Sequence, residues 1–373
     1  MARRAALAVI FAAALTFAPA PAYADTYRDQ LNSLDTSGMD EAIRESGLPA
    51  LDGVTVKGLI ERALSGSLDL SPESLAKAAL GALAGELAAL APVMRNLAVI
   101  CVAGAIIGAL SSAFPGAGAA EAGFFICYLT AAGLIVSCFT LSINIMDGML
   151  GSVTSLAQGS LPPLMALMAF SGSAGAAYTI SPALVLALTA LSTLIKNLVT
   201  PALTFAMALS LVSNLSEKPL LTKLSDLMRD CAGLVLKFAS GAFIVVVTIQ
   251  GVTIPVLNNA AAKTAKAALN AVPVVGSAMS GAVDIVSYWA GALKSGFLAA
   301  VIIIVIAVCA LPILKLAAVM LMFKLAAALM EPIADGRTVK AMESLARLTT
   351  VMLGSCVAAM TIFTFIIVVM LSA

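Results

Sequence analysis

PALVLALTALSTLIKNLVTPALTFAMALSLVSN, the run from Pro182 to Asn214, is apolar except for one charge, Lys196, near its middle. A comparable run from Phe297 to Met330 carries Lys315 and Lys324. At about 1.5 Å per residue, either run would make a helix about 50 Å long, against a hydrocarbon core of about 30 Å. We therefore expect each run to break, bend or lie partly outside the membrane, with the breaks at Lys196 and Lys315.

The composition supports a membrane protein. Apolar residues make up 61% of the 373 residues and charged residues only 11%, whereas soluble domains are about 45–50% apolar and about 25% charged. We predict an all-α, polytopic integral membrane helix bundle of about eight spans, preceded by a small helical head. Six to nine spans fit the pattern. Broken or re-entrant helices stay open within it, including a dip back into the membrane around Gly276 to Leu293.

The N-terminus has the features of a cleaved signal peptide over residues 1–24. Arg3 and Arg4 precede the apolar segment Ala5 to Ala18, which is too short to span, and Ala22-Tyr23-Ala24 forms an A-x-A cleavage signal. A cleaved signal leaves the following chain across the membrane, so we expect residues 25–92 to be extracytoplasmic. This segment is acidic, as the positive-inside tendency favours for a translocated region.

Two helices are predicted within residues 25–92. Val54 to Leu64 places apolar residues at helical spacing, at Val56, Leu59, Ile60, Ala63 and Leu64. Ser71-Pro72-Glu73 resembles a helix start and opens a helix toward Leu90. With so small an apolar core, we expect the head to pack on the membrane or on a partner.

Residues 93–373 are predicted to form the multi-span membrane domain. Val93 to Ala113 and Gly123 to Ile143 have spanning length, and Val351 to Leu371 is the last span. Two amphipathic stretches, near 216–230 and 337–350, are predicted to be interfacial helices. Each follows a lysine-bearing apolar run and precedes a span, which suggests an internal repeat with an offset of 119 residues. Ala- and Leu-rich chains also produce such a similarity by chance, so both readings stay open.

Four ionisable residues lie in or near apolar runs: Asp284, Lys196, Lys315 and Lys237. A lysine near the end of a span can extend its amine to the headgroups, which is the simpler reading. The other reading is that these residues line or gate a path, with Asp284 paired to a lysine. Beside Asp284, the segment from Pro273 to Gly276 is either a turn or a backbone break that lines a cavity.

Several classes of chemistry are disfavoured. The chain has no histidine, and its six cysteines form no CxxC pair, so we expect no catalytic, metal or cofactor site. No phosphate-binding loop occurs. We therefore expect a protein that is not an enzyme and that depends on a separate protein for any energy-consuming step.

Lys237-Phe238-Ala239-Ser240-Gly241 and the block from Asn270 to Asp284, NAVPVVGSAMSGAVD, resemble the stage III sporulation protein AE family. The resemblance implies a multi-pass protein of the mother-cell membrane around the forespore in an endospore-forming bacterium. It also implies a permease-like or channel-associated subunit of the mother cell–forespore transport complex. The implied partners are a secretion-type ATPase, other stage III sporulation membrane proteins and ring-forming intermembrane proteins, with no nucleic acid.

Two other functions fit the sequence. One is a structural membrane scaffold that assembles the complex without lining a path. The other is a stand-alone secondary transporter. The sequence does not identify the transported species.

Overall fold

The fold is described from a computed structural model. It covers residues 35–45, 55–64, 72–113, 117–170, 185–215, 221–270 and 276–372, with residues 250–295 described as backbone only. Its named elements are α3 (Ser37–Glu45), α4 (Val56–Leu64), α5 (Pro72–Ala113), α6 (Ala117–Gly159), α7 (Leu161–Phe170), η2 (Ile195–Val199), α9 (Thr200–Leu215), α10 (Thr222–Asn270), α11 (Gly276–Met330) and α12 (Gly336–Ser372). Residues 185–194 are also helical and lead into η2. Every regular element in these ranges is a helix, as predicted.

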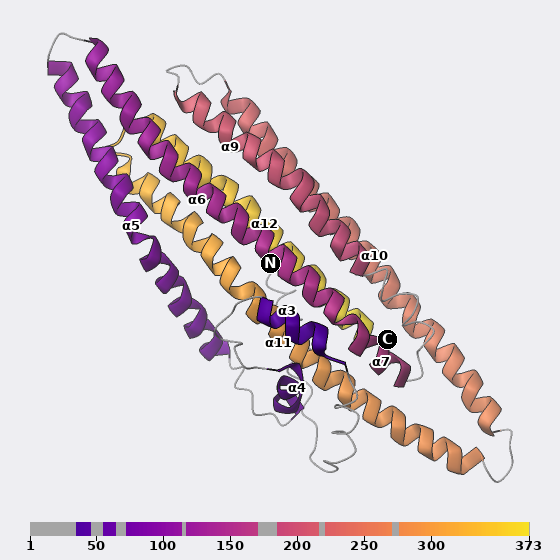
Figure 1. The fold of residues 1–373 in the computed structure, drawn as a ribbon. Coiled ribbons are helices and arrows are strands. Elements are labelled where there is room, and N and C mark those ends of the chain that lie inside the picture. The colour runs from indigo at the N-terminus through magenta and orange to yellow at the C-terminus, as the bar shows by residue number, and fades with distance from the viewer. Residues whose placement is uncertain are drawn as a thin grey trace.

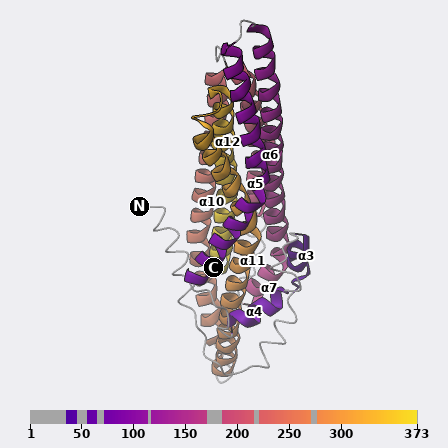
Figure 2. The ribbon, with the colours of Figure 1, turned by 90° about the vertical axis from the view of Figure 1, so that its left-hand side faces the viewer.

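The long helices run side by side along one direction (Figure 1). Consecutive helices form hairpins: α5 packs on α6, α9 on α10, and α11 on α12. The view from the side shows α3, α4 and α7 gathered beside one half of this elongated bundle (Figure 2). The C-terminal part of α10 and the N-terminal part of α11 project together past the other helices (Figure 1).

Five helical stretches in the described ranges are long and apolar enough to cross a membrane: Ala79–Ala109, Phe125–Leu167, Val185–Leu215, Gly296–Met330 and Gly336–Val369. In the most apolar 18 residues of each stretch, 50% are buried for Gly336–Val369 and 11% for Ala79–Ala109. Helix α12 is therefore central and α5 peripheral. The predicted number of eight spans remains a prediction, since only the described residues enter this comparison.

Large apolar side chains also cover the outside of the bundle. Phe238 is 71% exposed, Phe205 66% and Ile126 65%. In the described ranges, exposed large apolar side chains recur along α5, α6, residues 185–215 and α10, whereas large contiguous apolar patches are rare on soluble monomers. The outer surface therefore suits a lipid environment and agrees with the membrane class predicted from composition.

The helices do not break at Lys196 or Lys315, so these two predictions are wrong. Residues 185–215 are continuously helical through Lys196, and α11 continues through both Pro312 and Lys315. Similarly, α5 passes Pro92 and joins the helix predicted to end near Leu90 to the span predicted from Val93. A proline interrupts only local hydrogen bonds, and helices packed among neighbours tolerate it.

The two amphipathic stretches are likewise not separate helices. Residues 222–230 are the first turns of α10, and residues 337–350 belong to the first half of α12. Their interfacial position remains a prediction. The region from Gly276 to Leu293, a candidate for a dip into the membrane, forms the start of the continuous helix α11.

The two small N-terminal helices dock on the bundle itself. The helix predicted over Val54 to Leu64 forms as α4, and its Val56, Leu59 and Ile60 are buried as its spacing predicts. Helix α3 packs on α6, and α4 packs on α11. The head therefore finds its apolar partner in the same chain, in addition to whatever membrane or protein it contacts. Residues 1–34, including the predicted signal peptide, lie outside the described ranges.

Candidate functional site

Lys196 lies in η2, a short π-helical turn inside the helix of residues 185–215. The amide of Thr200 donates to the carbonyl of Ile195, and the Thr200 hydroxyl donates to the same oxygen at 3.2 Å. Pro201 follows and has no N–H to donate to the carbonyl of Asn197. The wider turn is thus the local response to Pro201. Such π-turns occur frequently at functional sites.

Asp147 of α6 lies close to Lys196 and interacts with it electrostatically. A Cβ atom at Gly151, one turn after Asp147, would lie 4.0 Å from Lys196 Nζ. The Lys196 amine therefore lies against α6 near Gly151, where a Cβ atom would make only ordinary van der Waals contact with it. In the described part of the chain, the buried Oδ1 of Asp147 has no hydrogen-bond partner. The fold thus brings a half-buried acid near an exposed base that is 49 residues away in sequence.

The surroundings of this pair come from three helical segments. Cys356 of α12 is fully buried and interacts electrostatically with Asp147. The hydroxyls of Thr154 and Ser192 form a 3.1 Å hydrogen bond between α6 and residues 185–194. We call Asp147, Gly151 and Lys196 the charge site. Its residues join α6 to the helix of residues 185–215, beside the central helix α12.

The other predicted site residues lie elsewhere. Lys237 and Lys315 are exposed on α10 and α11, and in the described ranges neither has an ion pair or a hydrogen bond. Gly276 is the first residue of α11, and Pro273 lies outside the described residues. The prediction that Pro273 to Gly276 is a backbone break lining a cavity therefore stays a prediction.

Asp284 lies near the start of α11, where only the backbone is described. Lys315 is 31 residues later in the same helix, a separation of about 46 Å at 1.5 Å per residue. Asp284 and Lys315 of one chain therefore cannot form an ion pair, and pairing of Asp284 with another lysine stays a prediction. Whether Asp284 lines a path stays a prediction.

A second polar cluster links the α9–α10 hairpin to α12. The Ser210 hydroxyl donates to Ser344 Oγ at 2.7 Å, and the Ser225 hydroxyl donates to the carbonyl of Ala206 at 2.7 Å. Arg337 at the start of α12 donates to the carbonyl of Leu215 at 3.4 Å. Apolar surroundings make such bonds costly to break. They fix the hairpin against the central helix.

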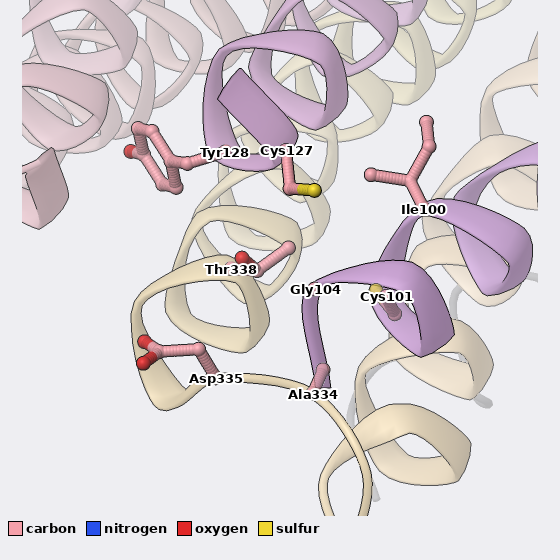
Figure 3. Close-up of a pocket in the computed structure, with 8 residues that line it drawn as sticks. All are labelled: Ile100, Cys101, Gly104, Cys127, Tyr128, Ala334, Asp335 and Thr338. Carbon is pink, nitrogen blue, oxygen red and sulfur yellow. The ribbon is translucent and has the colours of Figure 1, made fainter. Parts of the chain in front are cut away.

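A small cavity lies where α5, α6 and the start of α12 meet (Figure 3). It measures about 20 Å³, and a second cavity beside Ser225 and Ser344 measures about 10 Å³. Cys127 points toward the first cavity, while the Tyr128 ring turns away from Cys127 (Figure 3). The Tyr128 hydroxyl donates to the carbonyl of Leu211 at 2.7 Å. A volume of this size holds about one water molecule. Neither cavity can hold an organic solute.

Comparison with known proteins complements this geometry. The profile of stage III sporulation protein AE matches residues 54–373. The chain belongs to this family. The protein called stage III sporulation protein AE from Bacillus subtilis (strain 168) is 28% identical to it over 294 residues, which are 78% of this chain and 73% of the relative. No solved structure matches the chain.

Membership of the stage III sporulation protein AE family confirms the resemblance carried by the block from Asn270 to Asp284. Together with the five apolar helices, it makes this chain a sporulation membrane protein. The matched region begins just before α4 and includes the charge site. Helix α3 precedes the matched region.

Proposed function

We propose that this protein is a membrane-embedded, permease-like or channel-associated subunit of the mother cell–forespore transport complex required for endospore formation. The observation that carries the proposal is the charge site. An acid and a base inside apolar helices are costly in a membrane and usually serve a path for ions or solutes. In this proposal the site lines or gates that path, and the protein itself is not an enzyme.

The charge site is better explained by a functional role than by a contribution to stability. Asp147 is half-buried, and its Oδ1 has no hydrogen-bond partner in the described part of the bundle, whereas Lys196 is exposed. A buried acceptor without a donor costs stability, and an apolar residue at position 147 would pack without this cost. The carboxylate is therefore better explained by a requirement for a polar group at this place.

The remaining features of the proposal follow from the family. We propose a multi-pass protein of the mother-cell membrane around the forespore, with its N-terminal segment extracytoplasmic. Its partners would be the lipid bilayer, other stage III sporulation membrane proteins, a separate ATPase and ring-forming intermembrane proteins. The absence of a phosphate-binding loop from the sequence supports a separate source of energy.

A structural scaffold is the second candidate function. The water-sized cavities favour it, because a scaffold needs no space for a solute. The docked helices α3 and α4 also suit a protein whose role is to present a rigid surface. In that case the charges only hold neighbouring helices together, and neutral replacements should leave function unchanged.

Replacing Asp147→Asn or Lys196→Met should reduce heat-resistant spores by about tenfold or more, because each change leaves one member of a polar pair without its partner. The measurement is the spore count in an endospore-forming host that carries the variant as its sole copy, with protein level checked by immunoblot. Lys340→Met, an exposed change on α12, is the matched control and should have no effect. Normal spore counts for both site variants would instead support the scaffold.

A further inference from the structure

Helices α3 and α6 cross at an unusually close contact between two glycines. A Cβ atom at Gly159, the last residue of α6, would lie 2.5 Å from both the carbonyl carbon and the carbonyl oxygen of Gly38, and 2.9 Å from the Met39 amide nitrogen. These are backbone atoms, so no rotamer change could relieve the overlap. A Cβ atom at Gly38 would be less crowded, at 3.0 Å from Gly159 Cα. Only glycine at position 159 permits this approach.

Helices α3 and α4 form one small unit. Asp40 Oδ1 accepts a hydrogen bond from the amide of Val56, the first residue of α4, at 2.8 Å. Its other oxygen accepts a bond from the Thr36 hydroxyl at 3.1 Å. These bonds of the Asp40 carboxylate orient α4 relative to α3.

At the start of α3, the side-chain and backbone hydrogen bonds from Ser37 hold the pKa of the Asp35 carboxyl below its usual value.

This unit holds two long helices at once. Met39 and Ile43 of α3 are buried where α3 packs on α6, and Val56 and Ile60 of α4 are buried where α4 packs on α11. Gly159 also lies at the corner between α6 and α7, where the hydroxyl of the buried Ser160 donates to the carbonyl of Ala157 at 2.7 Å. The head is therefore clamped to the end of α6 and, through α4, to α11.

Helix α6 connects this clamp to the charge site. Gly159 and Asp147 are twelve residues apart in the same helix, which is about 18 Å. A shift or rotation at the end of a continuous helix displaces the side chains along it. We propose that the Gly38–Gly159 crossing is a latch through which the extracytoplasmic helices α3 and α4 control the charge site. The effect on the charge site rests on the proposed function, whereas the contact between α3 and α6 does not depend on it.

Gly159→Ala in the full-length protein tests the latch. The added methyl group should force α3 away from α6 and increase the rate of trypsin cleavage after Arg44, an exposed residue of α3, by about tenfold. Gly38→Ala should give a smaller increase, because its Cβ atom is less crowded. Gly148→Ala is the matched control on the same helix, where a Cβ atom would meet nothing within 4 Å. Its cleavage rate should be unchanged.

Alkylation of the native Cys356 by N-ethylmaleimide, followed by mass spectrometry, tests control of the charge site. Cys356 is fully buried beside Asp147, so release of the latch should increase its alkylation rate severalfold. We expect the largest increase in Gly159→Ala, a smaller one in Gly38→Ala and none in Gly148→Ala. Faster cleavage with unchanged alkylation would overturn the proposed control, and unchanged cleavage in Gly159→Ala would overturn the latch. If Gly159→Ala does not fold, the comparison of Gly38→Ala with Gly148→Ala decides. Neither readout uses spore formation, so a failure of the proposed function would appear separately.

Discussion

Replacing Lys196→Asp should reduce spore formation more strongly than replacing Lys196→Met. The aspartate would place a second carboxylate beside Asp147, whose Oδ1 is already buried without a donor in the described ranges. Two like charges near one another repel, and the neutral Lys196→Met lacks this repulsion. We expect a spore count lower than that of Lys196→Met by about tenfold or more.

The charge exchange Asp147→Lys with Lys196→Asp provides the decisive comparison. It restores one acid and one base at the same place, so it should recover part of the spore count lost by Lys196→Asp alone. Lys340→Asp, an exposed reversal on α12, is the control for a general effect of charge and should be tolerated. The charge site would have no role as a pair if the exchange recovered nothing and the reversal behaved like the neutral variant.

Phe323→Ala should destabilise the helix bundle strongly. Phe323 is fully buried in α11, which packs along α12. In soluble cores this change costs about 3–5 kcal/mol. In a membrane, moving the side chain from the core to the lipid costs little, because lipid is as apolar as the core. The remaining cost comes from the cavity that the truncated side chain leaves. We expect a cost of about 2 kcal/mol and a melting temperature lower by about 5 °C.

Thermal unfolding of the detergent-purified protein measures this effect, with Leu325→Ala as the matched control. Leu325 is in the same helix two residues later and is 51% exposed. Its truncation should leave the melting temperature nearly unchanged. Equal decreases for the two variants would mean that α11 is not packed on α12 through the face that contains Phe323.

Composition and periodicity predicted the helical membrane class and the docking face of α4, because both depend on the pattern of apolar residues alone. Helix continuity could not be predicted in the same way. A proline favours a helix end, but α5 continues through Pro92 and α11 continues through Pro312. The predicted break at Lys196 had a physical basis, since the π-turn before Pro201 lies there. The helix nevertheless continues.

Asp147 was missed because it lies in a mixed, Gly/Ser-rich stretch that lacks the contrast of a charge within an apolar run. A signal was present nonetheless. Asp147 is the only acidic residue between Glu121 and Glu217, and Lys196 is the only basic residue between Arg95 and Lys218. A single acid and a single base in so long an apolar region are natural partners. The spacing alone could not show that α6 brings them together.

The projecting ends of α10 and α11 have a consequence for recognition. Helix α11 has 55 residues, a length of about 80 Å, of which a hydrocarbon core accommodates only about 30 Å. The block that most resembles the family's sequence begins at Asn270, the last residue of α10, and ends at Asp284 in the first turns of α11. Both helix ends lie where the hairpin has passed the other helices (Figure 1). We therefore expect a partner that recognises this block to approach the bundle at its projecting end.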